Sequence, residues 1–325
     1  MAPTPLPSGL TEHEVTFENG AIHLAGTLTL PSVTAGAVKP PVVVLITGSG
    51  PQNRNEEVMG FRIFEALAHE LGLAGIASLR YDDRGVGAST GDFHASTTAD
   101  FATDTEAAVR WLKTQGSLID GAHIGLVGHS EGAMIAPLVA SRNAEVRFIV
   151  LLAAPAQPID ELLVEQMRRI GRVEGVPEEA LAQNIALSRR GFELVKAKED
   201  LRAHQAELGA VAVQQLSTPW FQYFVRYEPL PVLSGVRCPV LAIGGSLDLQ
   251  VPSDVNLPLI REAMKSANNA HAEVLEIEGM NHLLQAAKTG GVSEYSTLPK
   301  RIVPDVPRAI SRWVLALASP PVHRH

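Results

Sequence analysis

The stretch Gly121-Ala-His-Ile-Gly-Leu-Val-Gly-His-Ser-Glu-Gly132, followed by Ala133-Met-Ile-Ala-Pro-Leu-Val-Ala140, decides the fold. The apolar run 124–127 predicts a buried strand of a parallel sheet. It breaks into Gly-His-Ser-Glu-Gly, and an alanine-rich helical segment begins at once. This is the pattern G-x-S-x-G in a strand–turn–helix context, which lifts a strained serine above the edge of the sheet. Ser130 is therefore a candidate nucleophile.

Composition limits the possible classes of protein. The 325 residues are 46% hydrophobic and 19% charged, which is typical of a globular protein with a large core. The net charge of −8 argues against nucleic acid as a partner. A single cysteine, Cys238, excludes internal disulfides and cysteine-built metal sites. No apolar run approaches the length of a membrane span. No Lys or Arg precedes Lys39, so we expect a cytoplasmic protein unless a leader has been removed.

Further segments complete a mostly parallel eight-stranded sheet. Two strands flanking Asn19-Gly20 predict an antiparallel hairpin at one edge. Continuously apolar runs predict buried parallel strands, and apolar residues at helical spacing predict helices between them. The expected hairpin strands are 14–18 and 22–30, the other strands 42–46, 76–79, 124–127, 148–152, 239–244 and 272–277, and the main helices 57–71, 100–115, 253–266 and 305–317.

One long segment interrupts this alternation. Residues 159–228 have helical periodicity, many charges and no convincing strand, so we expect a helical cap inserted into the core domain. The predicted division is a core domain of residues 10–155 and 236–319, a cap of residues 156–235, and flexible termini of residues 1–9 and 320–325. In the cap, Trp220, Phe221 and Phe224 could form its own small core, line a substrate pocket, or do both.

Partners for Ser130 follow downstream, because a serine hydroxyl needs an adjacent base and an orienting acid. Asp248 and then His282 each come just after a predicted strand, in the order Ser, Asp, His. Asp254 is a weaker candidate for the acid, because it falls at the start of a helix. His129 is expected to pack beneath the turn rather than to serve as the base.

With these residues assembled, the sequence resembles the α/β-hydrolase superfamily over nearly its whole length. It is most similar to bacterial carboxylesterases with a Gly-His-Ser-Glu-Gly elbow, a group related to serine aminopeptidase-like hydrolases. Matching segments include Ile46-Thr-Gly-Ser-Gly-Pro-Gln52, Arg80-Tyr-Asp-Asp-Arg-Gly-Val-Gly87 and Gly244-Gly-Ser-Leu-Asp-Leu-Gln-Val-Pro252. One departure is Thr47-Gly48, where many relatives have His-Gly.

The resemblance implies an α/β-hydrolase fold and a serine hydrolase that cleaves small carboxylic esters, with short to medium acyl chains, and without a cofactor or metal. It also implies an oxyanion hole built from the backbone N–H groups of Glu131 and Ser49, with Gly50 as the alternative to Ser49. An aminopeptidase or amidase, or a thioesterase or acyltransferase, could use the same residues. A ligand-binding protein without catalysis could afford to lose a member of the triad, and none is missing.

Overall fold

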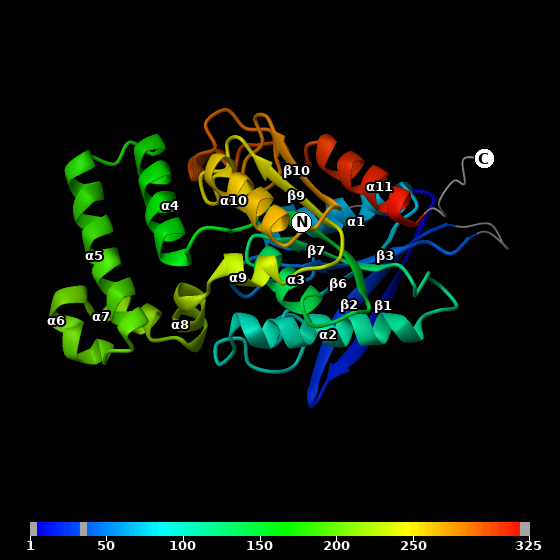
Figure 1. The fold of residues 1–325 in the computed structure, drawn as a ribbon, viewed down its shortest axis with the longest axis horizontal. Coiled ribbons are helices and arrows are strands. Elements are labelled where there is room, and N and C mark those ends of the chain that lie inside the picture. Colours follow the sequence, from blue (N-terminus) through cyan, green and yellow to red (C-terminus); the bar gives the residue numbers. More distant parts are fainter. Residues whose placement is uncertain (1–4, 33–37, 319–325) are drawn as a thin grey trace.

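A twisted eight-stranded sheet forms the centre of the molecule (Figure 1). The computed structural model describes residues 5–32 and 38–318. In spatial order the strands are β1 (Leu10–Asn19), β2 (Ile22–Pro31), β6 (Ala77–Tyr81), β3 (Val42–Ile46), β7 (Ile124–His129), β8 (Val146–Leu152), β9 (Val240–Gly245) and β10 (Ala272–Ile277). The pairs β1–β2 and β2–β6 are antiparallel, and all other neighbours run parallel. The predicted α/β-hydrolase fold class is confirmed.

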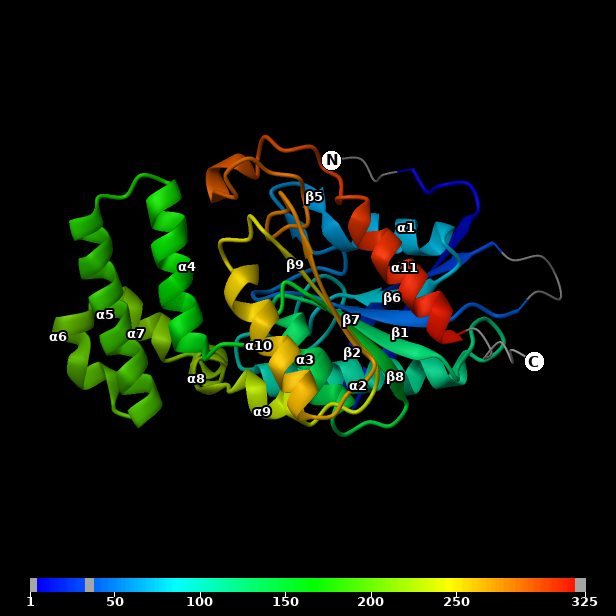
Figure 2. The same cartoon turned by 45° about the horizontal axis from the view of Figure 1, so that its top comes forward.

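Helices cover both faces of this sheet (Figure 2). On one face, α1 (Ile63–Leu73) and α11 (Asp305–Ala318) pack on apolar side chains of the central strands. On the other face lie α2 (Thr98–Thr114), α3 (Gly132–Ala140) and α10 (Ser253–Ser266). The central strands are buried on both sides, which explains their continuously apolar sequences.

All the segment between β8 and β9 is helical or irregular. Its helices are α4 (Ile159–Val173), α5 (Glu178–Ala197), the short 3₁₀ helix η1 (Leu201–His204), α6 (Gln205–Leu208), α7 (Ala210–Leu216), α8 (Pro219–Arg226) and α9 (Pro229–Ser234). Figures 1 and 2 show α4 to α7 beside one end of the sheet, while α9 packs against the core. The division into core domain and cap stays a prediction. Residues 1–4 and 320–325 of the predicted flexible termini, and residue 319 of the predicted core domain, lie outside the described residues.

The first part of one predicted helix is wrong. We expected a helix over residues 57–71, but α1 begins at Ile63, and residues 57–62 form a small hairpin of β4 (Glu57–Val58) and β5 (Phe61–Arg62). Met59 and Gly60 have φ angles of 47° and 76°, which a right-handed helix cannot contain. An ion pair of 3.2 Å between Glu57 and Arg62 joins the two short strands.

Candidate active site

The turn between β7 and α3 holds Ser130 in an unusual backbone conformation. Its φ angle is 54°, a region that costs a non-glycine residue of the order of 1 kcal/mol. A Cβ on Gly128 would lie 2.0 Å from the carbonyl oxygen of Gly132, and a Cβ on Gly132 would lie 2.0 Å from that of Ile46. Only glycine fits at either position. The turn therefore carries Ser130 to the carboxyl end of the sheet, at the N-terminus of α3.

Three predicted catalytic side chains lie together at this edge. Nε2 of His282 lies 3.2 Å from Oγ of Ser130, and Nδ1 of His282 lies 2.9 Å from Oδ2 of Asp248. Oδ1 of Asp248 accepts the backbone N–H groups of Gln250 and Val251 at 2.9 and 2.8 Å. Asp248 follows β9 and His282 follows β10, so the ends of two neighbouring parallel strands bring them together. Asp248 is held rigidly because both of its oxygens are engaged.

The alternative acid lies elsewhere. Asp254 is on α10, and 63% of its side chain is exposed. It forms an ion pair of 3.0 Å with Arg169 of α4. The geometry therefore joins His282 to Asp248 and leaves Asp254 on the surface.

The loop after β3 runs beside the serine. A Cβ on Gly48 would lie 3.2 Å from Cβ of Ser130, and the N–H of Gly48 already donates to Glu56. Among the described residues, no acceptor contacts the N–H of Ser49, Gly50 or Glu131. Unpaired N–H groups near a nucleophile can bind a developing oxyanion. Ser49 and Gly50 both remain candidates for the second donor, together with Glu131 of the elbow.

Sequence reasoning missed a buried pair beneath these residues. Nδ1 of His129 lies 2.8 Å from Oε1 of Glu56, and Nε2 of His129 lies 2.8 Å from the backbone oxygen of His282. A carbonyl oxygen can only accept, so Nε2 of His129 carries a proton. Oε1 of Glu56 also accepts the N–H of Gly48 at 2.6 Å. The pair thus connects the turn at Ser130, the loop after β3 and the loop that carries His282.

The protonation of His129 follows from its surroundings. Burial alone would lower the pKa of His129, but the Glu56 carboxylate and the carbonyl of His282 outweigh burial, and the pKa is raised. Glu56 itself has a φ angle of 47°, so the backbone is strained where it supplies this carboxylate. No sequence motif marks the pair, because its members are 73 residues apart.

Glu131 connects the elbow to the cap. Its carboxylate accepts a hydrogen bond of 2.7 Å from Oγ1 of Thr98. Nε1 of Trp220 donates to both carboxylate oxygens, at 2.9 Å to Oε1 and 3.0 Å to Oε2. Burial raises the pKa of Glu131 to about 7, although both hydrogen bonds oppose this effect. Burial also raises the pKa of Asp83 to about 8, and the charge of Glu131 adds to that shift. The side chain that follows Ser130 therefore holds α8 against the core.

The three aromatic residues predicted for a pocket lie in different surroundings. Trp220 stacks on Phe224 with ring centroids 4.9 Å apart, and it meets Phe221 edge-on at 5.8 Å. Phe224 is buried in a cluster with Met134 of the core and Tyr227. Phe221 faces the other way, toward Phe192 of α5, and lines a cavity between the helices of the cap.

Among residues 5–32 and 38–318, no group of three or more His, Cys, Asp or Glu side chains could hold a metal ion. Within the same residues, no helix combines the length and the apolar character that crossing a membrane requires.

Comparisons with known proteins bear on the family and the fold of the chain. The sequence model of the alpha/beta hydrolase family matches residues 43–291. Esterase EstD of Thermotoga maritima is 27% identical over 313 residues, which cover 95% of this chain and 68% of that protein. Among solved structures, Pyrococcus furiosus esterase Pf2001 has a TM-score of 0.60 at 16% identity, covering 94% of this chain and 91% of that chain. Est1E from Butyrivibrio proteoclasticus with bound ferulic acid has a TM-score of 0.58 at 19% identity, covering 94% and 99%. At these identities, the structural likeness concerns the fold.

Proposed function

Since the chain belongs to the alpha/beta hydrolase family, we propose that it is a serine esterase that cleaves carboxylic esters through an acyl-enzyme on Ser130. The observation that carries the proposal is the continuous series of contacts from Oγ of Ser130 through His282 to Asp248. The similarity to esterase EstD supports an ester as the substrate.

The first half of the reaction forms the acyl-enzyme. Nε2 of His282 takes the proton of Oγ as Ser130 attacks the ester carbonyl carbon, and Asp248 fixes the imidazole tautomer and stabilises the imidazolium. The N–H of Glu131 and that of Ser49 donate to the oxyanion, in a region where the N-terminus of α3 also favours negative charge. His282 then gives its proton to the leaving alcohol.

The second half releases the acid. Water enters, and His282 removes a proton from it as the water oxygen attacks the acyl carbon. A second oxyanion forms in the same place and collapses, and Oγ of Ser130 recovers the proton from His282. The acyl groups that we propose are short to medium chains, selected by the cap of residues 156–235 over a core domain of residues 10–155 and 236–319.

Substituting the serine tests the proposal. Ser130→Ala should lose about 10⁶-fold in kcat, because the acyl-enzyme can no longer form. A fluorophosphonate should label the wild type and leave Ser130→Ala unlabelled. Ser141→Ala, at the C-terminal end of α3, is the matched control and should be labelled like the wild type. Equal labelling of Ser130→Ala and wild type would remove Ser130 from the mechanism.

The substrate class needs a separate measurement. A panel of p-nitrophenyl esters, acyl thioesters and aminoacyl amides separates esterase from thioesterase and aminopeptidase activity. We expect the highest kcat/KM with the esters. A preference for aminoacyl amides, with Ser130→Ala inactive, would keep the nucleophile and change the substrate.

A further inference from the structure

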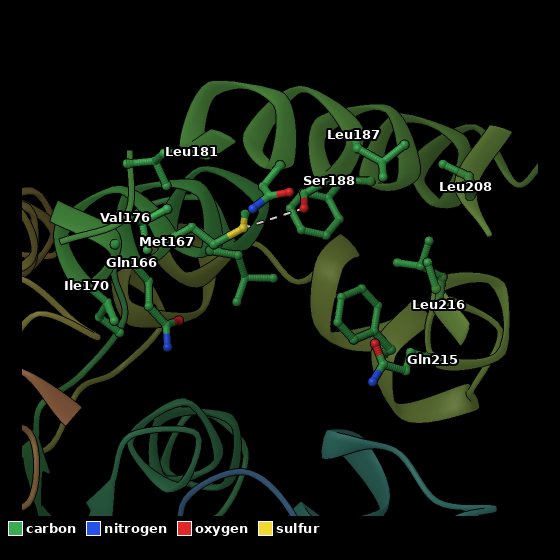
Figure 3. A pocket seen from close by; sticks show the side chains of 16 residues that line it. Gln166, Met167, Ile170, Val176, Leu181, Leu187, Ser188, Leu208, Gln215 and Leu216 are labelled. Atoms are coloured by element: carbon green, nitrogen blue, oxygen red, sulfur yellow. Dashed lines mark hydrogen bonds between the residues drawn. The ribbon is translucent and has the colours of Figure 1, made fainter. Parts of the chain in front are cut away.

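The cap contains a hollow that the proposed mechanism does not use. This cap cavity has a volume of about 550 Å³ and lies between α4, α5, α6, α7 and α8. Figure 3 shows the side chains of its walls. Its walls are mainly apolar, and no charged side chain is among the residues that line it. They include Met167, Ile170, Leu187, Leu208, Leu216 and Phe221. Small-molecule sites have this range of volume and this apolar character.

Polar groups occur at one rim of the cap cavity. Figure 3 shows the amides of Gln166 and Gln215 pointing from the cavity walls toward the ribbons of the core domain. Deeper in the cavity, the only hydrogen bond drawn joins Oγ of Ser188 to the sulfur of Met167 at 3.5 Å. The cavity is thus mainly apolar, with the amides of Gln166 and Gln215 on the side of the core and the polar side chains of Asn184 and Ser188 on α5.

Two series of contacts connect this cavity to the active site. On one side, Nε2 of Gln166 lies 3.4 Å from Oε1 of Gln250, whose N–H donates to Asp248. On the other side, Phe221 lines the cavity and meets Trp220, which donates to Glu131 next to Ser130. The walls of the cavity are therefore two contacts away from Asp248 on one side and from Glu131 on the other.

We propose that the cap cavity binds the hydrocarbon chain of the substrate, so that within the proposed range the enzyme prefers esters with a medium-length apolar chain to those with a short one. This inference rests on the proposed esterase function and deepens it. A charged tail is disfavoured because the lining offers no counter-ion. A hydrocarbon chain needs only apolar walls, and each buried methylene strengthens binding about fourfold.

The same reasoning separates the cap cavity from the rest of the ring cluster. Phe224 is 7% exposed and packs between cap and core, so a chain could reach it only by displacing that packing. The indole N–H of Trp220 is already bound to Glu131. Of the three rings, only Phe221 faces the cavity. The residues expected to set chain length are therefore those of α4, α5 and α7, together with Phe221 of α8.

Filling the cavity tests the proposal, and the chain provides matched controls. Ser188→Phe on α5 and Ala212→Phe on α7 place a ring inside the cap cavity. Ala186→Phe and Val211→Phe place the same ring on exposed positions of the same two helices, outside the lining. Each variant is compared with wild type on p-nitrophenyl butyrate and p-nitrophenyl laurate. Melting temperature and fluorophosphonate labelling of Ser130 verify that each variant is folded.

We expect Ser188→Phe and Ala212→Phe to lower the laurate-to-butyrate ratio of kcat/KM by about tenfold or more, since several methylenes lose their site. The two controls should keep the wild-type ratio. Lauryl acetate, which carries the chain on the alcohol, shows which side of the ester enters the cavity. The proposal is overturned if Ser188→Phe and Ala212→Phe both keep the wild-type kcat/KM, relative to p-nitrophenyl butyrate, for p-nitrophenyl laurate and for lauryl acetate. A changed oligomeric state with an unchanged ratio also overturns it, and makes the cavity a contact between copies of the chain.

A binding measurement keeps this test independent of turnover. Ser130→Ala should bind a fluorescent medium-chain fatty acid, and Ser130→Ala combined with Ser188→Phe should bind it at least about tenfold more weakly. If Ser188→Phe weakens binding of the fatty acid but the wild type hydrolyses no ester, the result would support chain binding in the cavity and refute the esterase function. If the wild type hydrolyses esters but Ser130→Ala does not bind the fatty acid, the result would support the esterase function and refute chain binding in the cavity.

Discussion

Removing the carboxylate of Glu56 should destabilise the protein although this residue takes no part in the chemistry. The side chains of Glu56 and His129 are 2% and 3% exposed, and their closest atoms are 2.8 Å apart. Breaking a buried pair by removing one partner costs about 3–5 kcal/mol, because the other charge stays uncompensated. Glu56→Ala also leaves the N–H of Gly48 without its acceptor. We therefore expect the free energy of unfolding to fall by about 3–5 kcal/mol near pH 6.

The cost should depend on pH in a defined direction. The pKa of His129 is raised above 6.5, so the contribution of its protonated form is fully present below pH 6.5 and is lost as pH rises through the folded-state pKa. Denaturant unfolding of wild type and Glu56→Ala at a series of pH values measures this difference. The gap in unfolding free energy should be widest at the acidic end and should narrow as the solution becomes alkaline.

Glu57→Ala is the matched control for this measurement. Glu57 is the next residue, and its carboxylate pairs with Arg62 at the surface. Loss of such a pair costs about 1 kcal/mol or less. Since His129 also holds the backbone of His282, Glu56→Ala should lower kcat by up to about 100-fold in folded protein. The reasoning fails if Glu56→Ala costs no more than Glu57→Ala, or if its cost is the same at every pH.

Three further predictions concern the acid, the elbow and the cap. Asp248→Asn should lower kcat by about 10⁴-fold, because the imidazole loses its tautomer, whereas Asp254→Asn should leave kcat within about twofold; steady-state kinetics of both variants checks this. Raising the pH from 4.5 to 7 should lower the free energy of unfolding of wild type by about 3 kcal/mol relative to that of Glu131→Gln. The reason is that the raised pKa of Glu131 stabilises the fold only while its carboxyl is protonated. Unfolding curves of both proteins at both pH values test the sign. Phe224→Ala should lower the free energy of unfolding by about 3–5 kcal/mol with little change in the chain-length profile, whereas Phe221→Ala should alter the profile; the opposite pattern would contradict the assignment of Phe221 to the cavity.

Local constraints explain why the sequence predicted the sheet so closely. A buried parallel strand must be apolar on both faces, and the elbow tolerates only glycine at positions 128 and 132. Both requirements are visible in consecutive residues. The candidate acid and base could also be named, because functional groups in this architecture follow strand ends, and strand ends can be read from the sequence.

Contacts between segments that are far apart in the sequence cannot be recognised from consecutive residues. Glu56, whose side chain contacts His129, immediately precedes the hairpin of residues 57–62, where the sequence predicts the first turns of a helix. Ordinary charged and apolar residues make up the hairpin, and its turn depends on a positive φ at Met59, a residue that seldom adopts one. The contacts of Glu56 with His129 and Gly48 could therefore not be predicted from the sequence.

The cap shows where periodicity stops being informative. Helical spacing predicts that each helix has an apolar face but not which neighbour covers it, because several packings can bury similar areas. The aromatic cluster was conspicuous in sequence, yet two of its rings connect the cap to the core, through Glu131 and through the packing of Phe224. The apolar cavity is built instead from scattered leucines, a methionine and a serine on four helices, none of which stands out alone. Substrate preference in this protein is therefore expected to depend on how the cap helices are spaced. A change of one exposed residue would leave this spacing intact, whereas a ring placed at Ser188 would alter it.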